Sequence, residues 1–338
     1  MKLTTPLTTF CFATALFLGA ATTPMAAQTL TGSGSTFINP IMGPWTTQYW
    51  KTKHVKVSYE PVGSGGGIAD IINSETDFTG SDVPMNATEL QEAHDPVVSV
   101  PDVIGGVAVV YHVPGVGPGI HLTGPVLADI FLGKIKYWDD SQITALSPGT
   151  SFPHTKIIPL HRKDGSGTTA IFTDYLSKVS HDWAAGPGTG KFITWPVGAD
   201  ARRSSGIVGT VKGEENTISY VELAYAIKFT VYYASVQNAR GQFIYPTSES
   251  CGAAADGVAI PSNLNISLTN TPNKAAYPIT GFSYLMTYQS SAKAGDLKKF
   301  MEWVVTTGQD VKFTRALSYA PLPRAIQAAD MKALETLK

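Results

Sequence analysis

The sequence contains very little cysteine. Of its 338 residues only Cys11 and Cys251 are cysteines, and Cys11 lies in an apolar segment at the N-terminus. If that segment is removed, Cys251 remains alone, so no disulfide can form within the chain. We therefore expect Cys251 to be a buried and inert thiol, as free cysteines usually are.

Acidic residues are absent from the N-terminus. Residues 1–27 carry Lys2 as their only charged side chain, continue through the apolar run FCFATALFLGAA and end in the small residues PMAA. This pattern is typical of a secretory signal peptide, and we predict cleavage after Ala27 and export of the chain. The apolar run is shorter than the roughly 20 residues that span a membrane, and no later segment supplies such a run.

An excess of basic residues is also missing. Removal of residues 1–27 takes away one Lys and no acidic residue, so the formal net charge goes from −1 to −2. This balance does not favour nucleic acid as a partner. The mature chain is longer than a usual single hydrophobic core, which favours two domains.

Several enzyme signatures are absent or incomplete. The seven histidines show no pair four residues apart and no cysteine partner, so no metal site is expected. The serines at 35, 64 and 166 do not lie in G-x-S-x-G, which excludes the nucleophile elbow of α/β-hydrolases. The segment 186–192, GPGTGKF, lacks the first Gly and the Ser or Thr of a phosphate loop, so we interpret it as an ordinary loop.

One enzyme alternative has a local match. Residues 165–170, GSGTTA, fit G-x-G-x-x-A, and Asp182 follows 17 residues after the first Gly. This pattern is found in dinucleotide-binding folds. The side chains of Arg162 and Asp164 would crowd such a turn, and export takes a protein away from cytoplasmic nicotinamide pools, so this interpretation is disfavoured.

Strands that lead through polar, Gly-rich turns into helices are the most regular feature of the chain. The order occurs around LTGSGSTF at 30–37, VGSGGG at 62–67 and RKDGSGT at 162–168. It predicts an α/β fold with mostly parallel strands. We expect a helix that begins near Pro40 or Pro44, a helix capped by Thr123, long strands at 102–113 and 277–289, and a helix at 297–306.

These turns are suited to bind anions. Glycine leaves backbone N–H groups unobstructed, and a helix N-terminus adds about half a positive charge. Arg162 would add a planar fork that fits tetrahedral oxyanions, and Asp164 is close enough to hold its guanidinium. The turn RKDGSGT alone also fits simple helix capping with a surface ion pair, but three turns of one kind favour an anion site.

Together these segments resemble one family, the periplasmic phosphate-binding proteins of ABC-type phosphate uptake systems. The matching segments, in chain order, are LTGSGSTF, VGSGGG, DFTGSDVP, VIGGVAVV, LGKIKYWDD, RKDGSGTTAIFTDYL, ISYVELAYA and YPIT. The resemblance implies an α/β periplasmic binding protein fold, type II-like, with two mixed sheets flanked by helices, a hinge of two crossing segments and a ligand in the interdomain cleft. Residues 28–107 and 276–338 would form one domain and residues 108–275 the other.

The resemblance also implies a binding site without catalytic residues, cofactor or metal. Asp164 would hold the guanidinium of Arg162 in place. Phosphate would be bound by eight residues from both domains: Thr36, Phe37, Ser64, Asp82, Arg162, Ser166, Gly167 and Thr168. The implied partners are inorganic phosphate and the inner-membrane permease subunits of the transporter, and the implied protein is a periplasmic monomer.

Asp82 is the residue that would select the anion. A carboxylate only accepts hydrogen bonds, and phosphate keeps a proton to donate, whereas sulfate has none. We therefore expect sulfate to be rejected by like charge and an unpaired acceptor. The alternatives are a binder of another tetrahedral oxyanion, such as sulfate or arsenate, and a secreted phosphoester hydrolase, which the lack of a metal cluster or activated nucleophile disfavours.

Overall fold

The structure is a computed structural model that describes residues 1–3 and 29–338. Most of the predicted signal peptide, including its cleavage site at Ala27, lies outside the described residues. The strands are β1 (Thr29–Gly34), β2 (Lys56–Glu60), β3 (Phe78–Ser81), β4 (Val97–His112), β5 (His121–Leu122), β6 (Ile158–Arg162), β7 (Ala199–Ala201), β8 (Thr217–Glu222), β9 (Tyr232–Tyr233), β10 (Ser235–Gln237), β11 (Phe243–Ile244) and β12 (Thr280–Tyr288). The helices are α1 (Asn39–Lys53), α2 (Ser64–Ile72), α3 (Ala87–Glu92), α4 (Gly124–Phe131), α5 (Ser141–Thr144), α6 (Gly167–Val179), α7 (His181–Ala185), α8 (Arg203–Gly213), α9 (Leu223–Lys228), α10 (Ser248–Ala253), α11 (Ala294–Val305) and α12 (Arg324–Leu334), with 3-10 turns at Thr307–Gln309 and Arg315–Leu317.

Most strands belong to one continuous mixed sheet. Its order is β2-β1-β3-β12-β4-β8-β6-β7, with β9 also paired to β4, and β11-β10-β5 form a small separate sheet. In the first half, β1 is parallel to β2 and β3, and β12 is antiparallel to β3 and β4. In the second half, β8 is antiparallel to β4, and β6 is parallel to β8 and β7. The two expected mixed sheets are therefore the two halves of one continuous sheet, joined at β4.

Strand β4 changes partners along its length. Its residues 97–106 pair with β12 and its residues 107–112 pair with β8. Gly106 lies at the change, where a Cβ would lie 2.7 Å from the Cys251 sulfur. The strand is buried almost throughout, which explains the long apolar run of its sequence. The chain returns beside this point, because Thr280 at the start of β12 pairs with Gly106.

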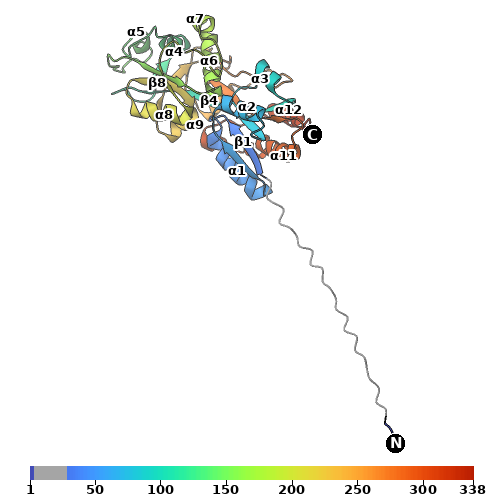
Figure 1. Ribbon diagram of the computed structural model, residues 1–338. Coiled ribbons are helices and arrows are strands. Elements are labelled where there is room, and N and C mark those ends of the chain that lie inside the picture. The colour runs from blue at the N-terminus through green and yellow to red at the C-terminus, as the bar shows by residue number, and fades with distance from the viewer. Residues whose placement is uncertain (4–28) are drawn as a thin grey trace.

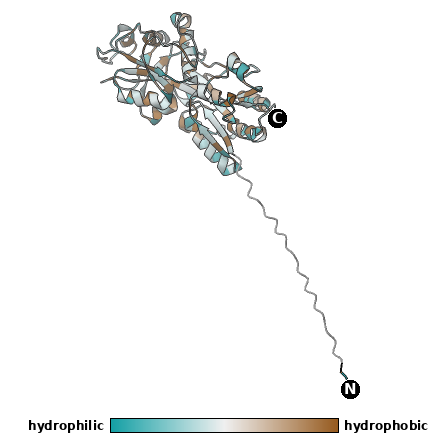
Figure 2. Cartoon of the chain, viewed as in Figure 1, coloured by the Kyte–Doolittle hydropathy of each residue, from teal (hydrophilic) through white to brown (hydrophobic). Residues whose placement is uncertain are grey.

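The helices cover each half of the sheet separately. Figure 1 shows α1, α2, α11 and α12 grouped with β1, near the C-terminus, and α4, α5, α7 and α8 grouped around β8. The helices carry both hydrophobic and hydrophilic residues (Figure 2), as helices that cover a sheet on one face usually do. In the part of the chain that the structure describes, no helix is long and apolar enough to span a membrane.

Local sequence signals explain where the helices begin. Helix α1 begins at Asn39 with Pro40 in its first turn, while Pro44 lies inside the helix. Thr123 caps α4 as predicted, because its side chain accepts a hydrogen bond from Val126 N. Cys251 is fully buried, which also agrees with the prediction.

The sequence predicts that the Gly-rich segment 63–67 is a turn that precedes a helix, and the structure differs from this prediction. Helix α2 already begins at Ser64, so most of the run forms its first turn. Gly63 has φ +102°, a conformation that favours glycine. A Cβ on Gly67 would lie 2.3 Å from Gly34 Cα, so the absence of a side chain lets α2 lie directly against the end of β1.

Candidate anion-binding site

Three of the polar turns meet at the carboxyl ends of parallel strands. The strands β1, β2 and β3 run parallel and side by side, so the turns that follow them lie at one edge of the sheet. Backbone hydrogen bonds join these turns, from Gly63 N to Gly34 O and from Ser35 N to Gly80 O, both at 2.8 Å. This arrangement brings the turns of residues 34–37, 63–67 and 80–84 together.

A fourth turn, RKDGSGT, comes from the second half of the sheet and meets the other three. Gly65 N donates a hydrogen bond to Gly165 O at 2.9 Å, and Gly167 N donates to Ser64 Oγ at 3.1 Å. The Thr168 hydroxyl donates to Asp82 Oδ2 at 3.2 Å. A Cβ on Gly167 would lie 2.6 Å from Asp82 Cβ, so glycine permits this close approach.

The eight residues predicted to bind the anion are all buried, and hydrogen bonds join several of them into one cluster. Their exposed fractions lie between 0% for Phe37 and 5% for Arg162, with Gly167 buried in the first turn of α6. Ser166 caps this helix, because its Oγ accepts a hydrogen bond from Thr169 N at 3.2 Å. Helices α2 and α6 thus both begin at the cluster, and the N-terminus of each helix contributes partial positive charge there.

The guanidinium of Arg162 is buried and held by Asp164. Arg162 Nε donates to Asp164 Oδ1 at 2.9 Å, and Nη2 donates to Oδ2, so the pair is bidentate. Asp164 Oδ1 also accepts a hydrogen bond from Arg203 N at 2.8 Å. Burial raises the pKa of Asp164, but the hydrogen bonds and charge of Arg162 outweigh burial and leave that pKa below its usual value. The pair is therefore charged at neutral pH, with one edge of the guanidinium directed away from Asp164.

Asp82 is a buried carboxyl that accepts hydrogen bonds from both halves of the cluster. Its Oδ1 accepts from Ser35 Oγ, and its Oδ2 accepts from Thr168 Oγ1. Burial raises the pKa of Asp82 to about 6, although the hydrogen bond from Ser35 and the charge of Arg162 act in the opposite direction. Above this pKa Asp82 is therefore an ionised acceptor among many donors, beside the ionised Asp164 that pairs with Arg162.

Ser35 is a further member of the cluster, with a role that the sequence did not reveal. Its Oγ accepts a hydrogen bond from Phe37 N at 2.9 Å while its hydroxyl donates to Asp82. The Phe37 N–H, predicted as a ligand donor, is thus directed toward a side chain of the cluster in this structure. Ser35 therefore links the first turn to the carboxylate of the third turn.

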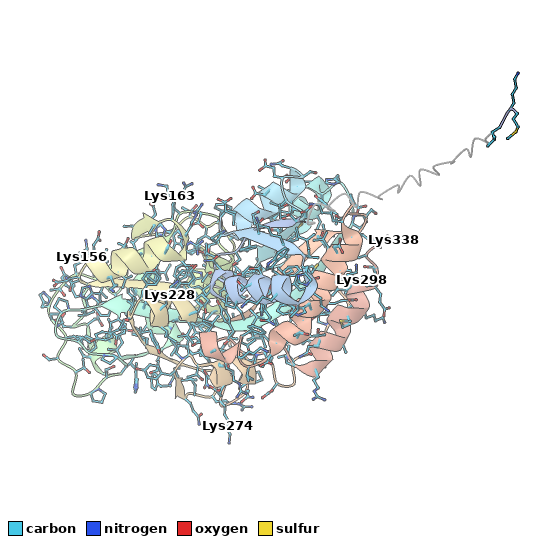
Figure 3. The ribbon with its side chains drawn as sticks, turned by 90° about the horizontal axis from the view of Figure 1, so that it is seen from below. Lys156, Lys163, Lys228, Lys274, Lys298 and Lys338 are labelled. Carbon is cyan, nitrogen blue, oxygen red and sulfur yellow. The ribbon has the colours of Figure 1, made fainter. Side chains whose placement is uncertain are left out.

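Ser204 is a member of the cluster that the sequence analysis missed. It is fully buried near the start of α8, its Oγ lies 2.8 Å from Thr36 Oγ1, and Arg162 Nη1 donates to it at 3.4 Å. A signal was available, because β7 leads directly into α8 and the first turn of this helix carries polar residues, Arg203, Ser204 and Ser205, as at the other strand-to-helix junctions. The neighbouring Lys163 is not a member, since it points away from the ribbon (Figure 3) and pairs with Asp200 at 3.3 Å.

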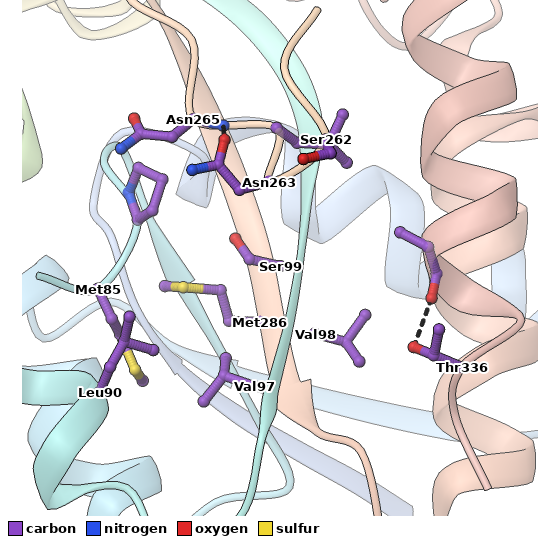
Figure 4. Close-up of a pocket in the computed structure, with 13 residues that line it drawn as sticks. Met85, Leu90, Val97, Val98, Ser99, Ser262, Asn263, Asn265, Met286 and Thr336 are labelled. Atoms are coloured by element: carbon purple, nitrogen blue, oxygen red, sulfur yellow. Dashed lines mark hydrogen bonds between the residues drawn. The ribbon is translucent and has the colours of Figure 1, made fainter. Parts of the chain in front are cut away.

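Two cavities of the protein differ in their relation to this cluster. A cavity of about 200 Å³ reaches Asp82 and is bordered by Pro84, Ile171 and Thr269, among others. A larger cavity of about 430 Å³ is lined by apolar side chains such as Met85, Leu90 and Met286, together with uncharged polar groups (Figure 4). No cationic side chain lines either cavity, and of the two only the smaller one reaches the cluster, through Asp82.

Within residues 1–3 and 29–338, no group of three or more His, Cys, Asp and Glu side chains is placed to hold a metal ion. The charged residues of the cluster are instead used in hydrogen bonds and in the Arg162–Asp164 ion pair. The geometry therefore favours direct recognition of an oxyanion by donors and one carboxylate.

Comparison with known proteins places the chain in a family. A model of the PBP superfamily domain matches residues 19–307. The chain is 39% identical over 316 residues to a phosphate-binding protein PstS of Xylella fastidiosa (strain 9a5c), which covers 90% of this chain and 86% of that protein. It is also 39% identical to the PstS of Haemophilus influenzae, covering 90% of this chain and 92% of that protein.

A solved structure has the same fold. The high-affinity periplasmic phosphate-binding protein PfluDING, bound with phosphate, superposes with a TM-score of 0.72 at 22% identity, covering 89% of this chain and 92% of that chain. At this level of identity the likeness concerns the fold. By its superfamily match and its similarity to the PstS proteins over nearly its whole length, the chain belongs to the PBP superfamily and, within it, to the family of the phosphate-binding proteins PstS.

Proposed function

We propose that this chain is an extracytoplasmic, high-affinity receptor for inorganic phosphate that delivers its ligand to the permease of an ABC transporter. The observation that carries the proposal is the buried cluster in which the cation Arg162 and the acceptor Asp82 lie among hydroxyl and backbone donors of four turns. The family relationship supports it, because the related proteins are named phosphate-binding proteins.

The proposed ligand contacts are the predicted ones. Thr36, Phe37, Ser64 and Asp82 would act from the first half of the sheet, and Arg162, Ser166, Gly167 and Thr168 from the second. Several of these groups now bond to one another, as Gly167 N does to Ser64 Oγ. A phosphate that enters would replace such bonds with shorter, charge-assisted bonds to its oxygens, which are stronger than neutral ones.

Asp82 supplies selectivity in this proposal. A phosphate oxygen that carries a proton donates it to the carboxylate, whereas a sulfate oxygen in the same position would meet a buried like charge without a proton between them. The raised pKa of Asp82, about 6, still leaves the group ionised near pH 8. Sulfate is therefore rejected, and arsenate, which also carries a proton, is not rejected by this residue.

The domain division is part of the proposal. Residues 28–107 and 276–338 would form one domain and residues 108–275 the other, and the change of partners along β4 at Gly106 supports a boundary there. Donors divided between two domains reach one anion only when the domains close, so binding would be coupled to closure. The protein would act as a periplasmic monomer, with permease subunits as its membrane partners.

The proposed protein is a receptor and not an enzyme. The groups nearest to the proposed ligand are hydroxyls, backbone N–H groups, a guanidinium and one carboxylate, and this set lacks the nucleophile and base pair of a hydrolase. A test is to denature the purified protein and measure released anions by ion chromatography, and to assay the native protein with a chromogenic phosphate ester. We expect about one phosphate per chain and no hydrolysis, while sulfate in place of phosphate, or ester turnover lost in Asp82→Asn, would contradict the proposal.

A further inference from the structure

Beyond the anion cluster, one buried ion pair joins the two halves of the sheet. Lys191 Nζ lies 2.6 Å from Glu89 Oε1, and the side chains are only 7% and 17% exposed. Glu89 lies on α3, between β3 and β4, whereas Lys191 lies in the loop between α7 and β7. The Glu89–Lys191 ion pair thus connects the two proposed domains, and its charged groups do not bond to any of the predicted phosphate-binding residues.

Lys191 is fixed to the phosphate-binding turn by its backbone. Ser166 N donates a hydrogen bond to Lys191 O at 3.0 Å, and Ser166 caps α6. The loop before Lys191 is anchored to the same helix, because Gly190 N donates to Thr173 Oγ1 at 3.2 Å. The ammonium of Lys191 is therefore presented by a rigid part of the second half.

Glu89 is fixed equally well on the first half. Its carboxylate accepts a hydrogen bond from Asn86 N at 2.8 Å, and Glu89 N donates to Asn86 Oδ1 at 3.0 Å, which together form a capping box at the start of α3. Because the capping box already holds the Glu89 side chain and both side chains are largely buried, forming the pair costs less side-chain entropy than a typical surface ion pair does.

The neighbouring Phe192 covers the same junction. A Cβ built on Gly165 would lie 2.4 Å from a Phe192 ring atom, and one on Gly65 would lie 3.1 Å from that ring. The ring thus lies over the point where Gly65 N donates to Gly165 O. The segment Lys191–Phe192 therefore extends from the second half across the junction to α3.

We infer that Glu89 and Lys191 are positioning residues that stabilise the closed arrangement and set the residence time of the bound anion. This inference rests on the proposed function for the identity of the anion and for the division into two domains that close. Opening the junction would expose this Glu89–Lys191 ion pair, which we call the latch, to water and salt, so the latch also makes closure sensitive to ionic strength. We expect loss of the pair to raise the phosphate dissociation rate by about tenfold, with a small change in association rate.

The test uses Glu89→Gln, which preserves the capping box, and Lys191→Gln, with Lys293→Gln as the matched control. Lys293 pairs with Asp77 at a similar distance, 2.8 Å, but both lie in the first proposed domain. Stopped-flow release of phosphate should be faster in both latch variants and unchanged in the control. The double variant should release phosphate no faster than either single variant, because each single substitution already breaks the ion pair.

A second readout does not depend on phosphate. Fluorescent labels on Lys156→Cys and Lys298→Cys, which lie near opposite ends of the molecule (Figure 3), report the distance between the proposed domains, and the buried Cys251 is protected from labelling. Ligand-free Glu89→Gln should show a longer mean distance than the control. If the wild type released no phosphate but Glu89→Gln still lengthened this distance, the phosphate assignment would fail and the inference about the Glu89–Lys191 pair would stand. Unchanged release and unchanged distance in both latch variants would overturn the latch.

Discussion

The hydroxyl of Thr168 donates a hydrogen bond to Oδ2 of Asp82 at 3.2 Å, although the two residues belong to opposite halves of the sheet. The other oxygen of the same carboxylate accepts from Ser35. Asp82 is thus the acceptor at which the turns of both halves meet, and its chemistry decides which anions can share the site.

The first prediction concerns Asp82→Asn. Asparagine keeps an oxygen that can accept the phosphate proton, so phosphate affinity should fall only about tenfold, or about 1.4 kcal/mol. Sulfate affinity should rise, because the amide removes the like charge and can donate to an unprotonated oxygen. Calorimetry with both anions near pH 8 measures the two constants. An unchanged ratio between them would remove Asp82 as the discriminating residue.

Arg162→Ala tests the cation of the site. The change removes charge-assisted bonds, each contributing about 1.5–3 kcal/mol, and leaves Asp164 without its buried partner. We expect phosphate affinity to fall about a thousandfold or more. The exposed neighbour Lys163 provides the control, since Lys163→Ala should change affinity very little. A loss of tenfold or less in Arg162→Ala would mean that this guanidinium does not contact the ligand.

Ser204→Ala tests the residue that the sequence analysis missed. Without its hydroxyl, Thr36 Oγ1 and Arg162 Nη1 each lose a partner. We expect the dissociation constant for phosphate to rise about tenfold, because a hydrogen bond contributes about 0.5–1.5 kcal/mol and more when one partner is charged. Ser205→Ala, one residue further and exposed, is the control. Equal affinities of the two variants would limit Ser204 to a packing role.

Asp330→Asn should change how stability depends on pH. Asp330 on α12 is fully buried, neither carboxyl oxygen has a hydrogen-bond partner among the described residues, and burial raises its pKa to about 8. Because its pKa is raised in the folded state, this carboxyl holds its proton more tightly there than in the unfolded chain. The free energy of unfolding therefore falls as the pH rises from the unfolded pKa, near 3.9, to the folded pKa, and it falls no further above the folded pKa.

The variant has no such proton to lose. Urea unfolding should therefore find Asp330→Asn more stable than the wild type by a few kcal/mol at pH 8.5, with a difference near zero at pH 4. Glu335→Gln, exposed just after the same helix, should show no such dependence. Equal stability of Asp330→Asn and wild type at both pH values would show that this carboxyl is hydrated or paired in solution.

Periodicity and turn chemistry were sufficient to predict much of the fold. Continuous apolar residues indicated β4 and β12, and Pro40 and Thr123 marked helix starts. These signals are local, and local backbone preferences decide them. The sharing of β4 by both halves was not predictable, because it depends on which distant strands pair with each end of one apolar run.

The site was predictable where its residues lie in Gly-rich turns. Arg162 and Asp164 are two residues apart, so their pairing could be inferred from a single turn. Ser204 and Lys191 lie in segments whose own sequence shows no ligand signal as strong as the Gly-rich turns. Their contacts to Thr36 and Glu89 arise only when distant segments fold together.

Calorimetry on ligand-stripped wild-type protein near pH 8 shows whether the buried cluster binds phosphate and rejects sulfate. We expect one tight phosphate site per chain and no measurable heat of binding for sulfate at the same concentrations. Sulfate binding as tight as phosphate binding, or no phosphate binding at all, would contradict this expectation.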